Sequence, residues 1–119
     1  MLNLNSLMIA TMQPKEMAAF YEKVFGKEPD MVEGEWYGWQ VGSSFIGIGH
    51  HSGMKGKTKE AGRVMFNLET SEVKQEFERI KKLGAEVVKE PYEMGGAWIA
   101  TFADLDGNYF QLMSPWNRN

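Results

Sequence analysis

Hydrophobic and polar positions follow two different periods along the chain, and the changes between them mark the predicted elements. The apolar stretch Leu4 to Ala10 predicts a strand that ends at polar residues and a proline. Apolar positions then recur at helical spacing between Pro14, which suits a first helical turn, and Gly26, which suits a left-handed stop. Two β-like segments, Trp36–Val41 and Ser44–Gly49, follow with a Gly-Ser pair between them that predicts a tight hairpin turn. The first half is therefore expected to be a strand, a helix and a meander of strands.

The second half repeats this pattern after a connector, His51–Gly62, that is rich in Gly and Lys and lacks periodicity. Arg63–Thr70 predicts a strand, and Ser71 is placed to cap a helix that ends at Gly84. The turn residues 104–108 separate the last two of three further strands, which are predicted at Ala85–Lys89, Ala97–Phe102 and Tyr109–Met113. The two aspartates of this turn are expected to bond the backbone rather than to act as an acid–base pair.

The shared order of elements indicates an internal duplication with an offset near sixty residues. Leu7-Met8-Ile9 aligns with Val64-Met65-Phe66, and Gly26 aligns with Gly84. We therefore expect one domain of two modules, at about 1–51 and about 62–119, joined by a linker at about 52–61.

Composition narrows the possible functions. The chain has 119 residues, 43% hydrophobic and 24% charged, which is typical of one packed globular domain. The net charge is -3, whereas proteins that bind nucleic acid or an anionic membrane typically carry an excess of positive charge, so neither is expected as a partner. The absence of cysteine excludes disulfides, thiol nucleophiles and thiolate zinc sites. With no secretory signal and no apolar run of bilayer length, a cytoplasmic location is the expectation.

Three motifs resemble one known family. The clearest is Ala100–Leu112, ATFADLDGNYFQL, which resembles the closing hairpin of the vicinal oxygen chelate superfamily, with Leu105 where proline is usual. Ala19–Gly26 resembles that family's first-helix signature, and Leu83-Gly84-Ala85 resembles the end of its second helix. The superfamily includes glyoxalase I, bleomycin-resistance proteins, fosfomycin-modifying enzymes and extradiol dioxygenases. The resemblance implies an α+β fold of two βαβββ modules, whose mixed sheet forms a cup-shaped cavity with the helices outside, and it implies a homodimer.

The same resemblance locates the positions that hold a divalent ion in metal-dependent relatives. They fall on Ser6, Gly47, Arg63 and Gln111. Gly47 has no side chain and Arg63 is permanently cationic, so only Gln111, and weakly Ser6, offers an oxygen ligand. We therefore expect the standard metal site to be lost and no cofactor to be required.

The two histidines, His50 and His51, follow the predicted fourth strand. Side chains of neighbouring residues on a strand point to opposite faces of the sheet. The two histidines can therefore bind the same ion only if the backbone has already left the sheet at this point. With Gln111 they are the remaining candidates for an unusual metal site; otherwise they are loop or surface histidines.

Strand alternation predicts which side chains face the cavity, because the family's metal positions define the inward parity. Leu7, Ile9, Val64, Phe66, Leu68, Phe110 and Leu112 then face the helices. For the seventh strand the family resemblance favours Ile99 and Thr101 as an inward pair, whereas the face of Trp98 stays open. The predicted ligand-binding residues are Ser6, Met8, Trp36, Phe45, Arg63, Met65, Asn67, Tyr109, Gln111 and Met113.

This lining of rings and thioethers suits a flat apolar molecule, although such residues are also ordinary core. Arg63 is placed to pair with an anionic group of the ligand, or with an acid at a module or dimer boundary. The leading hypothesis is thus a metal-independent protein that binds a small planar or aromatic molecule. One alternative is a lyase, isomerase or oxygenase that uses a non-standard metal site or none, and another is an interaction module whose cavity is filled by its own side chains.

Overall fold

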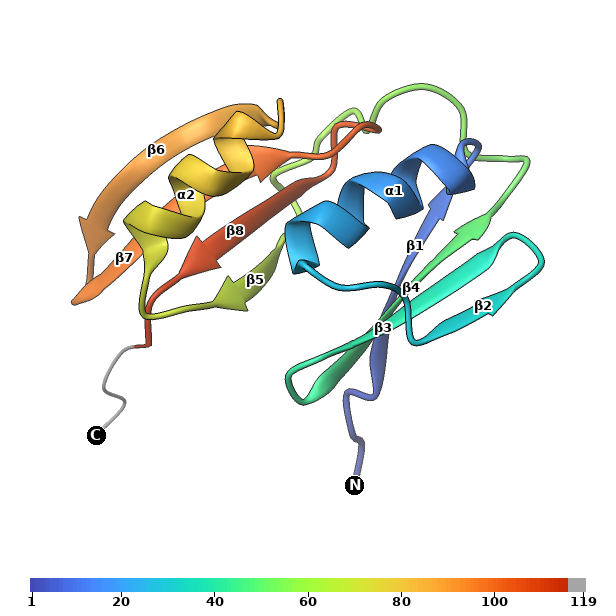
Figure 1. The fold of residues 1–119 in the computed structure, drawn as a ribbon, viewed down its shortest axis with the longest axis horizontal. Coiled ribbons are helices and arrows are strands. Elements are labelled where there is room, and N and C mark those ends of the chain that lie inside the picture. The colour runs from blue at the N-terminus through green and yellow to red at the C-terminus, as the bar shows by residue number, and fades with distance from the viewer. Residues whose placement is uncertain (116–119) are drawn as a thin grey trace. The chain divides into compact units, whose positions relative to one another are not determined.

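The computed structural model describes residues 1–115 of the 119-residue chain. The chain divides into two compact units, residues 1–56 and residues from 57 onward. The first module contains β1 (Ser6–Thr11), α1 (Pro14–Phe25), β2 (Met31–Glu33), β3 (Trp36–Val41) and β4 (Ser44–His50). The second contains β5 (Phe66–Glu69), α2 (Val73–Lys82), β6 (Glu86–Met94), β7 (Ala97–Ala103) and β8 (Tyr109–Met113) (Figure 1). The predicted α+β fold of two βαβββ repeats is confirmed.

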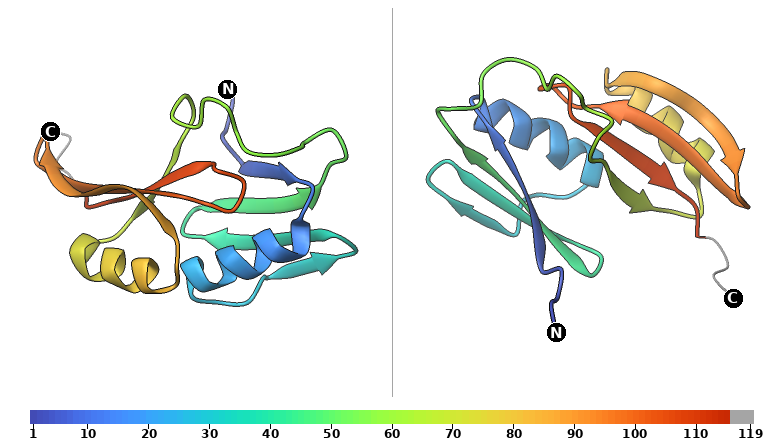
Figure 2. Two further views of the ribbon diagram at one scale, coloured as in Figure 1. Left: turned by 90° about the horizontal axis from the view of Figure 1, so that it is seen from above. Right: turned by 180° about the vertical axis from the view of Figure 1, so that it is seen from behind.

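Each module builds the same four-stranded mixed sheet. The strand orders are β1-β4-β3-β2 and β5-β8-β7-β6, and in both sheets the first strand of the module lies parallel to its last. In each module the helix packs on one face of its own sheet (Figure 2). Among the described residues, neither helix is long enough and apolar enough to cross a membrane.

The hairpin between β3 and β4 has the predicted two-residue turn. Val41 pairs directly with Ser44, and Gly42 at the turn has a φ of +59° that favours glycine. This register decides which residues of both strands face away from α1.

Both helices end as predicted, but the second begins differently. Gly26 closes α1 with a φ of +76° and donates its N–H to the Glu22 carbonyl oxygen. The prediction that Ser71 caps α2 is wrong, because the helix begins at Val73 with Glu72 at the N-cap position and no side-chain cap. The Thr70 hydroxyl instead accepts a hydrogen bond from the Glu72 N–H at 3.0 Å.

The fifth strand is shorter than predicted. It begins at Phe66 rather than at Arg63, and Val64 is 77% exposed instead of lying in the core. The sixth strand is longer, since it runs past Pro91 to Met94 with two register shifts against β7. An edge strand accepts proline because its outer N–H groups have no ladder partner.

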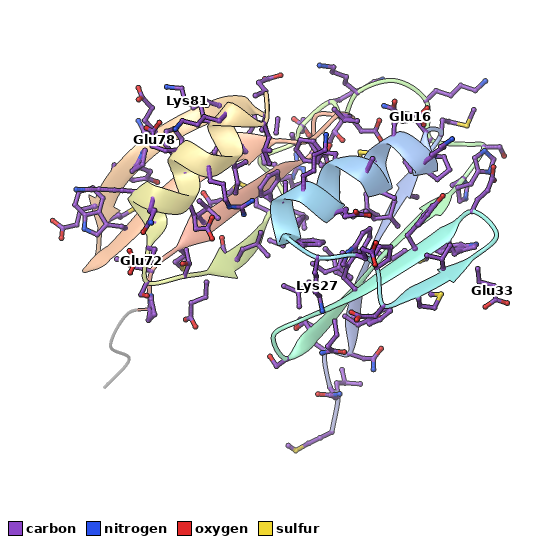
Figure 3. The ribbon with its side chains drawn as sticks, in the orientation of Figure 1. Glu16, Lys27, Glu33, Glu72, Glu78 and Lys81 are labelled. Atoms are coloured by element: carbon purple, nitrogen blue, oxygen red, sulfur yellow. The ribbon has the colours of Figure 1, made fainter. Side chains whose placement is uncertain are left out.

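Each core lies between a helix and its sheet. In the first module Met17, Tyr21 and Trp39 are fully buried. In the second, the Phe102 ring stacks on Phe77 and on Phe110 with centroid distances of 5.1 and 5.7 Å. Charged side chains such as Glu78 and Lys81 occupy the solvent side of α2 (Figure 3).

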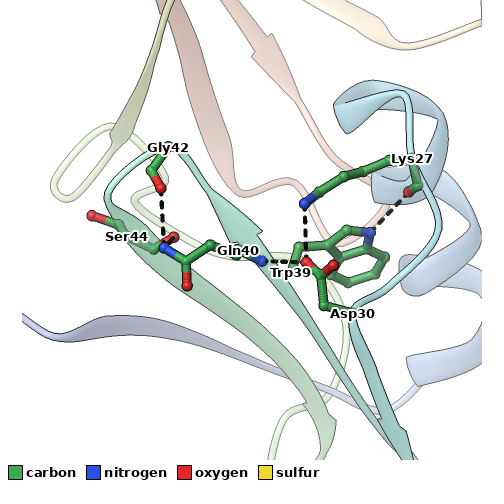
Figure 4. Close-up of polar contacts among 6 residues, drawn as sticks. All are labelled: Lys27, Asp30, Trp39, Gln40, Gly42 and Ser44. Carbon is green, nitrogen blue, oxygen red and sulfur yellow. Dashed lines mark hydrogen bonds and ion pairs between the residues drawn. The ribbon is translucent and has the colours of Figure 1, made fainter.

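The loop after α1 is fixed by a small polar cluster (Figure 4). The Trp39 indole N–H donates to the Lys27 carbonyl oxygen at 3.0 Å, and Lys27 Nζ lies 3.0 Å from Asp30 Oδ2. The Gln40 backbone N–H donates to the same carboxylate at 2.7 Å. These two hydrogen bonds, that from Gln40 first and that from Lys27 second, hold the pKa of Asp30 below its ordinary value of 3.8.

Candidate functional site

One face of the first sheet is directed away from α1. Residues paired across neighbouring strands share a face, so the β1–β4 pairs place Ser6 with Phe45 and Met8 with Gly47. The β3–β4 and β2–β3 pairs extend the same face across the sheet. This face carries Ser6, Met8, Ala10, Met31, Glu33, Trp36, Gly38, Gln40, Phe45, Gly47 and Gly49. The structure thus places the four predicted ligand-binding residues of the first module on one face.

Two aromatic rings lie directly over glycines of this face, where the absence of a side chain makes room for them. A Cβ added to Gly49 would stand 2.3 Å from Cε3 and Cζ3 of Trp36. A Cβ added to Gly38 would stand 2.2 Å from Cζ of Phe45. Both distances are far below the contact distance of ~3.5 Å between carbon atoms, so the rings rest directly on glycine backbone.

The rings and two methionines form an apolar surface, which we call the platform and define as Met8, Met31, Trp36 and Phe45. Met8 is 63% exposed, Trp36 is 41% exposed and Met31 is 38% exposed. Apolar patches of this kind on a sheet face are typical of binding sites. Beside the platform, Gln40 is already engaged, since its Nε2 donates to the carbonyl oxygens of Gly42 and Ser44.

Met31 belongs to this surface although the sequence reasoning did not assign it to the site. It lies on β2, a three-residue strand too short for a visible alternation of apolar and polar positions. The available signal was the Gly34-Glu35 pair, because a Gly-X pair between β-like residues is typical of a two-residue hairpin. Glu33 does pair directly with Trp36 across that turn.

The corresponding face of the second sheet is more polar and is held by a ladder of three side chains. The Thr101 hydroxyl donates to Oε1 of Gln111 at 2.8 Å, and Nε2 of Gln111 donates to Oδ1 of Asn67 at 2.8 Å. The three residues come from adjacent strands, with Asn67 opposite Gln111 and Thr101 opposite Gln111. Thr101 therefore faces away from α2, as predicted.

The same register places the remaining residues of this face. Met113 lies opposite Ile99 and Tyr109 lies opposite Ala103, on the side of the sheet that carries Gln111. Trp98 faces the other way, because Lys74 of α2 lies over its ring with Nζ 4.0 Å from the centroid. Met65, two residues before Asn67, precedes β5 and is 40% exposed.

Arg63 does not lie on a strand. It follows a turn in which its N–H bonds the Glu60 carbonyl oxygen, and its Nη2 lies 2.7 Å from Glu60 Oε2. Both side chains are largely exposed, so this ion pair is screened by solvent. The expected inward position of Arg63 on the fifth strand is therefore wrong.

The two modules show why that position was misassigned. In the first module the metal position Gly47 on β4 pairs with Met8, and the other metal position, Ser6, lies two residues before Met8. Gln111 is the counterpart of Gly47 in the second module. In the second module the residue that pairs with Gln111 is Asn67, so the residue two before it is Met65 and not Arg63. A slip of two residues keeps every side chain on its original face, and the hydrophobic pattern cannot detect it.

The metal positions of the family, corrected in this way, are Ser6, Gly47, Met65 and Gln111. Ser6 supplies a hydroxyl, Met65 supplies a thioether, and Gly47 has no side chain. The amide oxygen of Gln111 already accepts a hydrogen bond from the Thr101 hydroxyl. This donor set does not fit a divalent ion, which binds through imidazole or carboxylate groups at such sites. Within residues 1–115 no three His, Asp or Glu side chains gather closely enough to form another metal site.

The histidines are directed to different local partners. Nδ1 of His50 lies 3.6 Å from Oε2 of Glu35, which belongs to the turn between β2 and β3. His51 follows the end of β4, and its Nδ1 accepts the Gly53 N–H at 3.0 Å. His50 shares the parity of Ile48, so it lies on the α1 side of the sheet rather than with the platform.

Within the described residues, the second module carries a hollow on each side of its sheet. One, of about 320 Å³, is lined by residues 71–75 at the start of α2 together with Trp98 and Ser114, on the helix side of the sheet. The other, of about 180 Å³, lies on the face that carries Gln111 and is lined by Tyr109, Ala103 and Glu86 of the sheet, by Gly107, and by residues 57–59 and 61. The smaller hollow is the one that contains a predicted ligand-binding residue.

The sequence model of the Glyoxalase-like domain family matches residues 6–113 of this chain. The chain belongs to this family. The glyoxalase-like domain is thereby placed in the vicinal oxygen chelate superfamily, as the sequence motifs indicated. No curated protein matches the chain.

Solved structures similar to this glyoxalase-like domain share its fold. A hypothetical protein from S. aureus is 24% identical, with a TM-score of 0.77 over 97% of this chain and 95% of that one. A glyoxalase/bleomycin resistance protein/dioxygenase family enzyme from Burkholderia phytofirmans PsJN is 22% identical, with a TM-score of 0.77 over 95% and 98%. The fosfomycin resistance protein FosX from Listeria monocytogenes is 19% identical, with a TM-score of 0.76 over 100% and 95%.

Proposed function

We propose that this glyoxalase-like domain binds a small planar, aromatic molecule on the platform and does so without a bound metal ion. The observation that carries the proposal is the arrangement of Trp36 and Phe45, whose rings lie directly over Gly49 and Gly38 as part of an exposed apolar surface. A ring of the ligand stacks on these rings, which contributes ~0.5–1.5 kcal/mol per pair beyond the burial of apolar area.

The methionines on either side suit a ligand of irregular outline. Met8 and Met31 have unbranched, polarizable side chains that adapt to the shape they contact. Ser6, which pairs with Phe45 at the edge of the platform, supplies a hydroxyl for one polar group of the ligand. This combination of apolar area and few polar groups favours binding of the molecule over its conversion.

The donor chemistry of the family's metal positions supports the second half of the proposal. Gly47 has no ligand atom, and the Gln111 amide oxygen is already an acceptor for Thr101. A metal-dependent reaction at these positions would need donors that the chain does not have there. We therefore expect binding to be insensitive to chelators.

The test uses the saturated and aromatic forms of one small molecule. In ¹⁵N-labelled protein, titration with 2-naphthol is expected to shift the indole N–H signal of Trp36 and to leave that of the buried Trp39 unchanged. Decahydro-2-naphthol, which has a similar outline but no aromatic ring, is expected to bind at least several-fold more weakly.

Two variants identify the surface. Trp36→Ala is expected to weaken 2-naphthol binding about tenfold or more, because it removes both stacking and apolar contact. Val32→Ala removes an exposed apolar side chain from the opposite face of the same sheet and is expected to change the affinity less than twofold. Equal losses in the two variants, or equal binding of the two naphthol forms, would refute the proposal.

A further inference from the structure

The smaller hollow of the second module has a chemistry that the platform lacks. Its volume is about 180 Å³, and its inner side is formed by Tyr109 of β8 and the small residue Ala103 of β7, which pair across the sheet. Such a volume is below that of a site for a whole drug-sized ligand, and it suits one functional group with a few attached atoms.

Two lysines line this hollow. Lys57 and Lys59 make no ion pair with any residue among 1–115, whereas the nearby Arg63 is paired with Glu60. Glu86 also lines the hollow. The two lysines and this glutamate give the hollow one excess positive charge, in a chain whose net charge is -3. Among the residues that line the hollow, one carboxylate therefore stands against two ammonium groups.

The lysines are held in place by the residue between them. Thr58 donates its N–H to the Asp106 carbonyl oxygen at 2.8 Å, and its hydroxyl donates to Oδ1 of Asn108. This segment therefore lies against the turn between β7 and β8 (Figure 1). With Thr58 anchored to the turn, the residues on either side of it line the hollow.

The stem of Lys57 is positioned by a glycine. A Cβ added to Gly107 would stand 3.4 Å from Cβ and 3.6 Å from Cδ of Lys57, so the lysine stem crosses directly over this residue. The φ of +81° at Gly107 favours glycine in any case. On the other side, the Tyr109 ring lies close to Gly62, with 3.7 Å from an added Cβ to Cε2 of the ring.

We propose that this hollow is a binding site for the oxyanion group of a small organic acid, such as a phosphonate, a phosphate ester or a carboxylate. Lys57 and Lys59 supply the positive charge and N–H donors, and the Tyr109 hydroxyl supplies a further donor at the inner side. The site lies wholly in the second module and does not depend on the proposed binding of an aromatic molecule at the platform. It also assigns anion recognition to Lys57 and Lys59, in place of the ion-paired Arg63.

The experiment compares two anions with a neutral molecule of similar shape. Phenylphosphonate, benzoate and benzamide are titrated into ¹⁵N-labelled protein, and affinity is taken from the saturation of backbone N–H shifts. Phenylphosphonate and benzoate are expected to shift residues 57–59, Gly107 and Tyr109, and to bind more weakly as salt is added. Benzamide is expected to cause no saturable shift there.

Charge-removing variants test the assignment of the two lysines. The double variant Lys57→Met and Lys59→Met keeps the apolar stems and is expected to weaken phenylphosphonate binding about tenfold or more. Lys55→Met removes one positive charge, from a lysine that does not line the hollow, and is expected to change the affinity less than twofold. Tyr109→Phe is expected to give a smaller loss than the double lysine variant.

Three results would overturn the proposal. One is an equal loss of affinity in Lys55→Met and the double variant, since this indicates a diffuse charge effect. Another is saturable binding of benzamide with the same shifts, and the third is an absence of saturable binding by both anions. Because 2-naphthol carries no anionic group at neutral pH, the test of the platform stands or fails separately.

Discussion

Replacing Gly49 by alanine tests whether the Trp36 ring rests directly on the glycine backbone. The added methyl group would stand 2.3 Å from the indole, against a contact distance of ~3.5 Å, so the ring has to withdraw by more than ~1 Å. No positive φ is required at Gly49, so alanine is compatible with its backbone conformation.

The expected magnitude follows from the covered area of the indole. Trp36 is 41% exposed. An indole side chain of ~200 Å² then has ~120 Å² covered, which corresponds to ~3 kcal/mol at ~25 cal/mol per Å². If withdrawal exposes half of that area, Gly49→Ala costs ~1.5 kcal/mol, and the lower entropy of the unfolded alanine chain returns ~0.5–1 kcal/mol. The net expectation is a loss of ~0.5–1 kcal/mol in the free energy of unfolding.

The sign of the effect changes when the ring is absent. In a Trp36→Ala background the clash disappears, and Gly49→Ala is expected to stabilise the protein by ~0.5–1 kcal/mol. Gly47→Ala is the matched control, because the nearest atom to its added Cβ is the Tyr37 carbonyl oxygen at 3.9 Å. It is expected to stabilise in both backgrounds.

Urea unfolding followed by circular dichroism measures all of these free energies. Direct contact of the Trp36 ring with Gly49 is refuted if Gly49→Ala has the same effect with and without Trp36, or if it matches Gly47→Ala in the wild-type background.

Three further predictions address the polar contacts. Asp104→Ala leaves the N–H groups of Asp106 and Asn108 without their carboxylate acceptor. It is expected to lower the free energy of unfolding, measured in urea, by ~3 kcal/mol. A loss below ~1 kcal/mol would count against the role of this buried carboxylate. Because the pKa of Asp30 is lowered on folding, its contribution is present above pH ~4 and is lost as pH falls through the folded-state value. Wild-type stability is therefore expected to decline more steeply below pH ~4 than that of Asp30→Asn, and parallel curves would contradict this. Thr101→Val removes the donor to the Gln111 amide oxygen and is expected to cost ~1 kcal/mol, which thermal unfolding detects; an unchanged melting temperature would contradict it.

The sequence predicted those parts of the fold that local chemistry specifies. The bounds of the first helix followed from a proline that suits its first turn and from Gly26, whose left-handed φ is present in the structure. The register of the β3–β4 hairpin followed from a two-residue Gly-Ser turn, and this register placed Trp36 and Phe45 on one face. The family resemblance, rather than the alternation of this strand, favoured the inward position of Thr101, and the structure pairs Thr101 with Gln111.

The misassigned residues lie where tertiary contacts decide. A two-residue slip in the duplicated strand was invisible to the pattern, and it placed Arg63 on a strand when it lies in a turn with Glu60. Val64 is apolar and was assigned to the core, but it precedes β5 and is exposed. The contacts of Thr58 with the turn at 106–108 join segments about fifty residues apart, and no local signal indicates them.

Several expectations stay predictions. They include the cup formed by the two sheets, the homodimer, the cytoplasmic location and the roles of the ligand-binding residues.

Metal-independent binding at the platform is the central claim, and calorimetric titration with 2-naphthol before and after treatment with EDTA tests it most directly. Untagged protein is expected to give the same affinity and the same enthalpy in both titrations. Loss of binding after EDTA, with recovery on addition of zinc, nickel, manganese or iron(II), would contradict the account.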